Sequence, residues 1–155
     1  MKIVLALLVL VWPATASGDA LPLQRGSWSQ LLQAHQGHAL IVHFWGVTCG
    51  PCLAELPEWG KFHARRPEID LVLVQADPDA DLPSEPAMLL AKAGLGDVES
   101  WRFADPFVER LQYEIDPQWH GELPLTLLIS RDGASMSSFG VINFDDLVDW
   151  LAKHS

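Results

Sequence analysis

The chain contains one stretch that decides its architecture: Phe44-Trp45-Gly46-Val47-Thr48-Cys49-Gly50-Pro51-Cys52. Its two cysteines are the only cysteines in the sequence of 155 residues. A largely apolar run, residues 39–45, leads into the pair, and a helix-permissive run, residues 53–66, leads away from it. A Cys-x-x-Cys motif between a strand and a helix is typical of a redox-active dithiol.

The spacing of the two cysteines has a physical reason. If Cys49 caps the helix and Cys52 lies one turn inside it, the two sulfur atoms share a face and come within disulfide reach. The free N–H groups of the first turn and the helix dipole then favour a thiolate on Cys49. Pro51 falls in this turn, where a missing N–H costs little. We therefore expect Cys49 to be the nucleophile and a buried Cys52 to resolve the mixed disulfide.

Two other uses of the cysteine pair compete with this interpretation. A zinc site usually needs four ligands, often two Cys-x-x-Cys pairs or a cysteine pair with a histidine pair, but the sequence has one cysteine pair. A purely structural disulfide would close a very short ring and would therefore stabilise little. We prefer the redox dithiol, and we expect neither a metal nor a cofactor.

With Glu55-Leu56-Pro57 following it, the cysteine stretch resembles the active-site region of exported thioredoxin-like thiol-disulfide oxidoreductases of the TlpA/ResA type. A later run resembles their second signature, a cis-proline followed by a strand and a tight turn: Gly121-Glu122-Leu123-Pro124-Leu125-Thr126-Leu127-Leu128-Ile129-Ser130-Arg131-Asp132-Gly133. The resemblance covers most of the chain. It implies an α/β thioredoxin fold, with a central mixed β-sheet flanked by helices on both faces.

Composition and charge limit the class of protein. A hydrophobic content of 49% supports a packed core, and the length fits one domain. The formal net charge of −10 argues against nucleic acid or an anionic membrane surface as a partner.

The first residues have the pattern of a secretory signal peptide. Lys2 supplies the positive start, residues 3–12 form an apolar core too short to span a bilayer comfortably, and residues 14–16 are small. We expect residues 1–16 to be removed and residues 17–155 to form the thioredoxin-like domain; an uncleaved anchor is the alternative. The expected compartment is the bacterial periplasm, which permits disulfides.

Periodicity and capping signals predict the remaining elements. Helices are expected at 27–36, 51–66, 84–94, 105–114 and 144–154, and strands at 38–45, 69–76, 99–104, 124–130 and 134–140. Residues 17–26 are expected to be an extended lead-in, and residues 77–86 an acidic loop. Ser27 with Gln30 forms a candidate capping box, and Asp105 and Asn143 are candidate helix caps. Pro57 is expected to kink the second helix.

Two residues could accept the proton that Cys52 must lose. Glu55 lies three residues beyond Cys52 on the same helix, and the resembled subgroup carries an acidic residue there; the alternative is an ordinary surface glutamate. His43 points to the same face of its strand as Trp45. Thioredoxins proper have a buried aspartate where His43 falls, so His43 is either a proton relay or a satisfied core histidine.

The resemblance also implies three residues of a client-binding site. Pro124 matches the cis-proline that faces the disulfide, which leaves the backbone of Leu123 free to pair with a client chain. Trp45 matches the tryptophan that packs beneath the disulfide. Thr48 stands where relatives often have a tryptophan, which makes the rim of the site less apolar.

Three functions remain open on the sequence alone. The leading hypothesis is a periplasmic reductant of client disulfides. The resemblance implies a role in cytochrome c maturation or related thiol maintenance, with a membrane thiol transporter as electron donor. The second is a disulfide oxidase or isomerase on the same fold. The third is a metal-handling module that uses both cysteines and His43.

Overall fold

The computed structural model describes residues 20–77 and 85–154, in which the chain forms six strands and five helices. The strands are β1 (Leu21–Leu23), β2 (Leu40–Trp45), β3 (Asp70–Gln75), β4 (Glu99–Phe103), β5 (Leu125–Ile129) and β6 (Ser135–Phe139). The helices are α1 (Ser27–Ala34), α2 (Gly50–Arg65), α3 (Glu85–Lys92), α4 (Val108–Ile115) and α5 (Phe144–His154). The expected signal peptide and most of the expected acidic loop lie outside the described residues.

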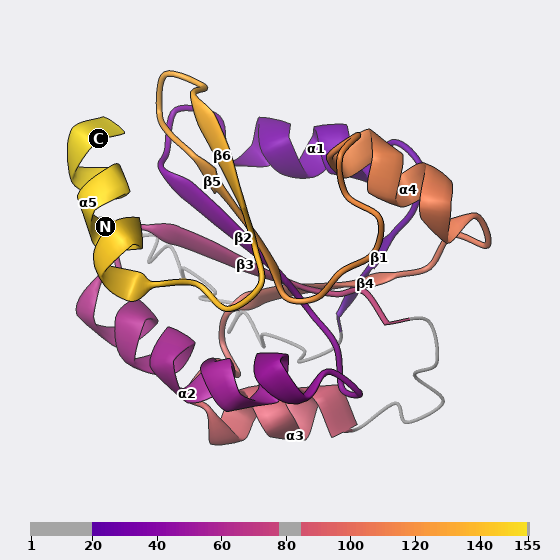
Figure 1. Cartoon of the computed structure of the whole chain (residues 1–155), viewed down its shortest axis with the longest axis horizontal. Helices are drawn as coiled ribbons and strands as arrows, with labels where there is room; N and C mark the ends of the chain where they lie inside the picture. Colours follow the sequence, from indigo (N-terminus) through magenta and orange to yellow (C-terminus); the bar gives the residue numbers. More distant parts are fainter. Residues whose placement is uncertain (1–19, 78–84, 155) are drawn as a thin grey trace, which may run out of the picture.

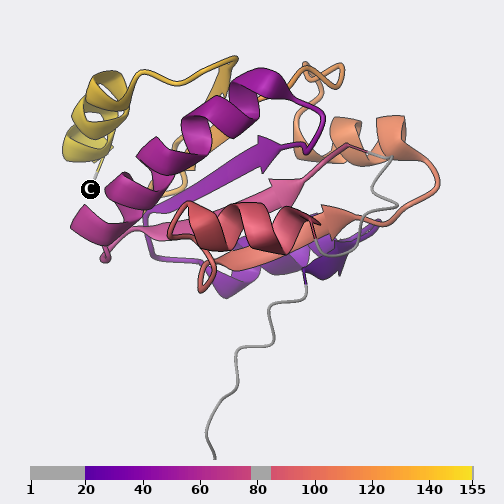
Figure 2. The same cartoon turned by 90° about the horizontal axis from the view of Figure 1, so that it is seen from below.

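The strands form one mixed sheet in the order β1-β4-β3-β2-β5-β6. The first four strands in this order are parallel to one another, whereas β5 runs antiparallel to β2, and β6 runs antiparallel to β5. Helices α2 and α3 cover one face and helices α1 and α4 the other, as Figures 1 and 2 show. Helix α5 packs with α2 in the same core cluster. The predicted architecture, a mixed sheet with helices on both faces, is confirmed.

Strand β2 lies at the centre of the sheet and is buried along its whole length. Leu40, Val42 and Phe44 enter the core cluster beneath α1 and α4, and Ile41 and Trp45 enter the cluster on the α2 side. Because successive side chains of a strand point to opposite faces, a strand in this position must be apolar on both. This explains the nearly continuous apolar run before the cysteines.

Strand β1 is absent from the sequence prediction, which placed a lead-in there. It has three residues and pairs only with β4, in the register Leu21↔Trp101 to Leu23↔Phe103. A strand of three residues is too short to show a recognisable alternation of apolar side chains, and β1 is extended because it pairs with β4.

The capping box predicted at Ser27 and Gln30 is also wrong. Gly26, with a φ of 82°, is the N-cap residue, and Ser27 Oγ accepts the N–H of Gln24 instead.

The predicted helix cap at Asp105 is also wrong. Helix α4 begins at Val108 behind the N-cap residue Phe107, and no side chain caps it by a hydrogen bond. The Asp105 carboxylate accepts the backbone N–H groups of Phe107 and Arg25, so it ties the end of β4 to the segment before α1. The cap at Asn143 agrees with the structure, since its side-chain oxygen accepts the N–H groups of Asp145 and Asp146.

Helix α2 continues without interruption through Pro57. The turn predicted after β5 is present: Gly133 has a φ of 86°, and Ser130 N donates to the Ala134 carbonyl at 2.8 Å. No helix within residues 20–77 and 85–154 is long and apolar enough to cross a membrane.

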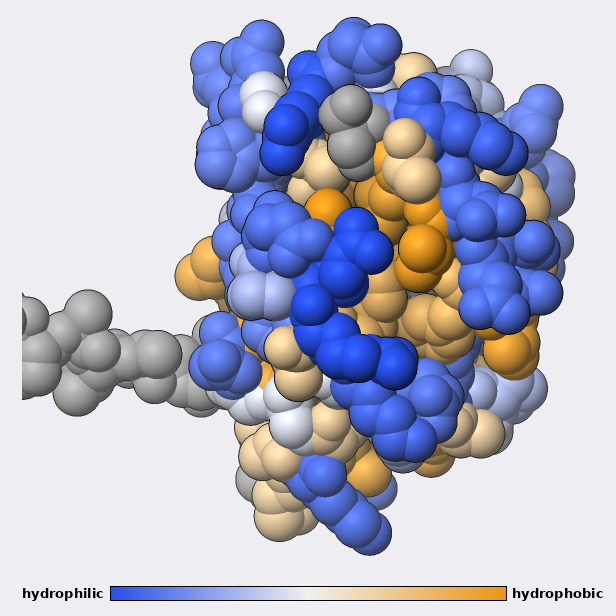
Figure 3. Space-filling view, turned by 90° about the vertical axis from the view of Figure 1, so that its left-hand side faces the viewer, coloured by the Kyte–Doolittle hydropathy of each residue, from blue (hydrophilic) through white to orange (hydrophobic). Residues whose placement is uncertain are grey.

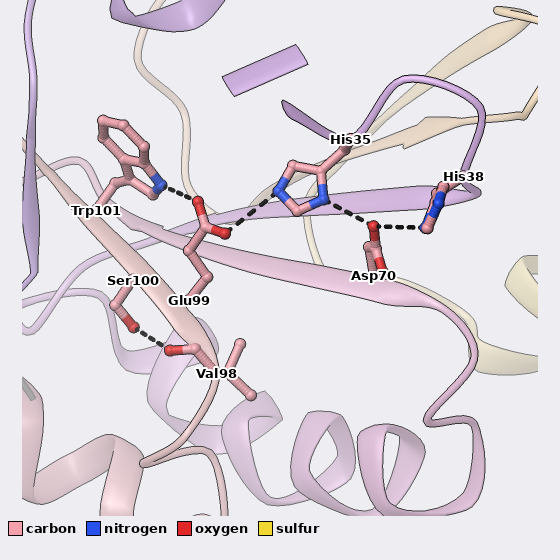
Figure 4. A network of polar contacts seen from close by, with 7 residues as sticks. All are labelled: His35, His38, Asp70, Val98, Glu99, Ser100 and Trp101. Carbon is pink, nitrogen blue, oxygen red and sulfur yellow. Dashed lines mark hydrogen bonds and ion pairs between the residues drawn. The ribbon is translucent and has the colours of Figure 1, made fainter. Parts of the chain in front are cut away.

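The end of the sheet where the parallel strands begin carries a polar network, shown in Figure 4. His35 Nδ1 lies 2.7 Å from Asp70 at the start of β3, and His35 Nε2 lies 3.3 Å from Glu99 at the start of β4. The network therefore ties the end of α1 to two neighbouring strands.

Figure 3 shows the end of the molecule that lies at the left in Figure 1. Apolar surface there forms a central hollow bordered by hydrophilic side chains.

Candidate active site

Cys49 and Cys52 form a disulfide, with their Cα atoms 5.2 Å apart. Cys49 is the N-cap residue of α2, and its sulfur accepts the N–H of Cys52 at 3.3 Å. Cys49 is partly exposed, whereas Cys52 is fully buried at 0% exposure. This is the arrangement that the Cys-x-x-Cys spacing predicted: one sulfur that a client can reach and a second sulfur behind it.

The fold places the pair where β2 ends and α2 begins, at the carboxyl edge of the parallel strands. Pro51 occupies the first turn of α2, so it removes an N–H that has no partner within the helix. The remaining N–H groups of this turn and the helix dipole create a positive potential at Cys49, which favours its thiolate.

Glu55 is buried, at 4% exposure, so it is not a surface residue. Its Oε1 accepts the backbone N–H of Ile142 at 2.8 Å, a contact that ties α2 to the segment between β6 and α5. Burial raises the pKa of the Glu55 carboxyl, and the hydrogen bond from Ile142 lowers it by less. The nearby Trp59 side chain also lowers the pKa of Glu55, although the indole N–H of Trp59 makes no hydrogen bond of good geometry.

His43 is fully buried beside Glu55. Its Nδ1 lies 3.0 Å from Thr126 Oγ1 across the β2–β5 pair, and its Nε2 lies 3.8 Å from Glu55 Oε2. Burial lowers the pKa of His43 to about 3, so the imidazole is neutral at neutral pH. Neither His43 Nε2 nor Glu55 Oε2 has a hydrogen-bond partner among the described residues. Two atoms that can each hold a proton thus lie 3.8 Å apart within the core.

The peptide bond between Leu123 and Pro124 is cis. The Pro124 carbonyl accepts the N–H of Gly140 at 2.8 Å, which links this bond to the end of β6. Leu123 is partly exposed and contacts both core clusters.

Trp45 is only 1% exposed and belongs to the core cluster that contains Cys52, as a packing role beneath the disulfide would require. A part for Trp45 in client binding stays a prediction. Trp119, which could have lined the site, is also buried, and its indole N–H donates to the Glu122 carbonyl.

Sequence reasoning missed three residues that contact the site: Thr126, Ile142 and Asp77. Thr126 lies inside an apolar strand pattern, and Ile142 contributes only its backbone, so neither carries a sequence signal. Asp77 does have one, because it follows directly on a buried strand parallel to β2, and the carboxyl ends of parallel strands share an edge.

Two other features lie apart from the cysteines. A groove of about 680 Å³ between α1 and the β5–β6 hairpin is lined by residues that include Leu32, Leu127 and Ile129, and neither cysteine lines it. Across the described part of the chain, no group of three or more His, Cys, Asp or Glu side chains is arranged to hold a metal ion.

Comparison with known proteins bears on the fold. No family model and no curated protein matches the chain. Among solved structures, a secreted disulfide oxidoreductase of Mycobacterium tuberculosis, described as homologous to E. coli DsbE, is 19% identical, with a TM-score of 0.62 over 78% of this chain and 85% of that one.

Two further structures give the same result. A putative thioredoxin from Neisseria meningitidis is 18% identical, with a TM-score of 0.63 over 79% of this chain and 77% of its own. A secreted thiol-disulfide isomerase from Corynebacterium glutamicum is 18% identical, with a TM-score of 0.60 over 77% of this chain and 72% of its own. The chain therefore has the thioredoxin-like fold, with a Cys-x-x-Cys disulfide at the start of α2.

Proposed function

We propose that the protein is an exported thiol-disulfide oxidoreductase of the TlpA/ResA type that reduces disulfides in client proteins. The observation that carries this proposal is the Cys49–Cys52 disulfide at the start of α2, with Cys49 accessible and Cys52 buried. The similar folds of proteins described as a disulfide oxidoreductase and a thiol-disulfide isomerase support the same class of reaction.

The reaction starts from the reduced dithiol. The Cys49 thiolate attacks one sulfur of a client disulfide, a mixed disulfide forms, and the other client sulfur leaves as a thiolate that takes a proton from solvent. Cys52 then loses its proton and attacks the Cys49 sulfur, which releases the second client thiolate. The client gains two electrons, and the dithiol becomes the disulfide seen here.

Two buried side chains, Glu55 and His43, are placed to assist proton transfer from Cys52. Because Cys52 is buried, ionisation in place is unfavourable without a nearby acceptor. Glu55 lies three residues further along α2, within the same buried region, and its second oxygen faces His43. We assign Glu55 as the proton acceptor, with His43 as the group that can exchange this proton with it.

The direction of the reaction is proposed from the residues between the cysteines. Gly50-Pro51 contains no histidine to stabilise the Cys49 thiolate, so the reduced form is not strongly favoured. A weakly favoured reduced form makes a reductant, with a potential below about −200 mV. The isomerase among the similar folds keeps an oxidase or isomerase as the second candidate.

The compartment follows from the expected signal peptide, and the partners follow from the resemblance to the TlpA/ResA type. A reductant in the periplasm needs a dedicated electron source, and a membrane thiol transporter would supply it. Client proteins would include apocytochrome c, proteins with metal-site cysteines, and proteins with misformed disulfides. The leading alternative for the first residues is an uncleaved anchor.

Trapping variants test the proposed function. Cys52→Ser should accumulate mixed disulfides with a protein client because the resolving thiol is gone, and Cys49→Ser should abolish disulfide reduction. Non-reducing electrophoresis after incubation with the client measures both. Trapping through Cys52 in the Cys49→Ser variant would reverse the assigned roles. A redox titration of the unaltered protein against glutathione that gave a value near about −120 mV would assign an oxidase instead.

A further inference from the structure

Asp77 lies next to the segment that leads into Cys49. It follows two residues after Gln75, the last residue of β3, and β3 runs parallel to β2. The carboxyl ends of the two strands therefore lie at the same edge of the sheet, where β2 continues toward α2. This topology brings Asp77 against the turn of residues 46–48.

Three hydrogen bonds hold the Asp77 carboxylate in place. Its Oδ2 accepts the backbone N–H of Thr48 at 3.1 Å and the Thr48 hydroxyl at 3.3 Å. Its Oδ1 accepts the side-chain amide of Gln75 at 3.0 Å, and Gln75 is buried. Asp77 is itself partly buried. An acceptor held on both oxygens, one of them from a buried donor, is fixed rather than free in solvent.

The turn is shaped to admit this carboxylate. A Cβ atom on Gly46 would lie 2.8 Å from both Cγ and Oδ2 of Asp77, closer than such atoms approach one another. Glycine at position 46 therefore allows the contact. The same turn is closed by the N–H of Cys49, which donates to the Gly46 carbonyl at 3.3 Å. Cys49 and the Asp77 carboxylate thus both hydrogen-bond to the backbone of one short turn, residues 46–48.

We infer that Asp77 is a positioning residue that fixes the turn before Cys49 and lowers the reduction potential of the disulfide. The inference rests on the proposed function only for its biological use. Its physical basis is that the N-terminus of α2 favours a thiolate on Cys49, whereas a carboxylate held one residue away disfavours it. A less stable thiolate makes the reduced form less stable, and the dithiol then gives up its electrons more readily.

Asp77→Asn tests the charge, because an amide keeps the shape and an oxygen acceptor. We expect the variant to shift the equilibrium with glutathione toward the dithiol by about twofold to tenfold. The midpoint of Cys49 alkylation should move to lower pH in the same protein. Asp97→Asn is the matched control, since Asp97 is an exposed acid before β4 and its replacement changes net charge equally.

Gly46→Ala tests the same contact without removing the charge. The added methyl group should push the Asp77 carboxylate off the turn, so the potential should move in the same direction as in Asp77→Asn. The double variant should show no further shift, because the two changes remove one interaction. The urea midpoint of each variant shows whether it remains folded.

The inference is overturned if Asp77→Asn and Asp97→Asn have the same equilibrium with glutathione and the same alkylation midpoint as the unaltered protein. It is also overturned if Gly46→Ala and Asp77→Asn shift the equilibrium additively. Alkylation of the reduced protein needs no client. A failure to reduce clients would therefore reject the proposed function while leaving this measurement able to decide the role of Asp77.

Discussion

At the scale of single residues, the buried Glu55 is the side chain whose chemistry matters most after the cysteines. Its carboxyl has one oxygen engaged by a backbone N–H and the other facing His43. Burial raises its pKa, so a proton taken from Cys52 is held more firmly than on an exposed glutamate.

We predict that Glu55→Gln slows resolution of the mixed disulfide at neutral pH. Glutamine preserves the oxygen that accepts the Ile142 N–H, but it cannot take a proton. Removing the negative charge should also move the alkylation midpoint of the cysteines to lower pH, because the charge repels a thiolate. Stopped-flow turnover across pH and alkylation of the reduced protein measure the two effects.

Glu58→Gln is the matched control for this prediction. Glu58 lies on the same helix, but its side chain is exposed and pairs with Lys61 at 2.6 Å. An unchanged pH–rate profile together with an unchanged alkylation midpoint in Glu55→Gln would show that Glu55 has only a structural role.

At the scale of elements, the β2–β5 pair carries the His43–Thr126 contact and makes stability depend on pH. His43 has a pKa near 6.5 in the unfolded chain and about 3 in the folded protein. Between these values the unfolded state binds a proton that the folded state does not. The contribution of His43 to stability is therefore present above about pH 6.5 and is lost as the pH falls toward 3.

We predict that His43→Phe makes stability less dependent on pH between 6.5 and 4, because the unfolded state no longer gains this proton. Over the full range to pH 3, the effect amounts to at most about 5 kcal/mol. Urea denaturation at a series of pH values measures it. Glu55 acts in the opposite direction, since its raised pKa adds stability that is lost as pH rises.

The comparison is therefore made in a Glu55→Gln background, where this opposing effect is absent. Equal pH slopes with and without His43→Phe in that background would mean that His43 takes up a proton in the folded state. That result would contradict its buried, neutral form.

At the scale of the whole molecule, the His35 network in Figure 4 fastens α1 to the amino ends of β3 and β4, far along the sheet from the disulfide. Its members come from three elements, so it joins parts of the chain that packing alone would leave free to slide. His35 is largely buried, which makes its contact with Asp70 stronger than an exposed ion pair.

We predict that His35→Gln lowers the free energy of unfolding by about 1.5 to 3 kcal/mol, the range for a hydrogen bond to a charged group. His38→Gln is the control, because the His38 side chain is 67% exposed although it lies 3.3 Å from the same Asp70 oxygen. Its loss should cost less than about 1 kcal/mol. Equal losses in the two variants would show that burial of His35 adds nothing.

Features that depend on residues close together in the chain could be predicted from the sequence. The cysteine spacing placed one sulfur at a helix start and the other a turn inside it. The alternation of residues 40–45 placed His43 and Trp45 on one face of their strand, and Asn143 marked the start of α5. Each of these follows from the periods of helix and strand or from a local hydrogen bond.

The surroundings of the sulfur atoms could not be predicted from the sequence, because they come from distant parts of the chain. Glu55 meets the N–H of a residue 87 positions away, His43 meets Thr126 across 83 positions, and Asp77 meets Thr48 across 29. Strand β1 exists because β4 lies beside it. Such contacts depend on the order of the strands in the sheet. Local sequence periodicity does not reveal that order, so it cannot predict which distant atoms come together.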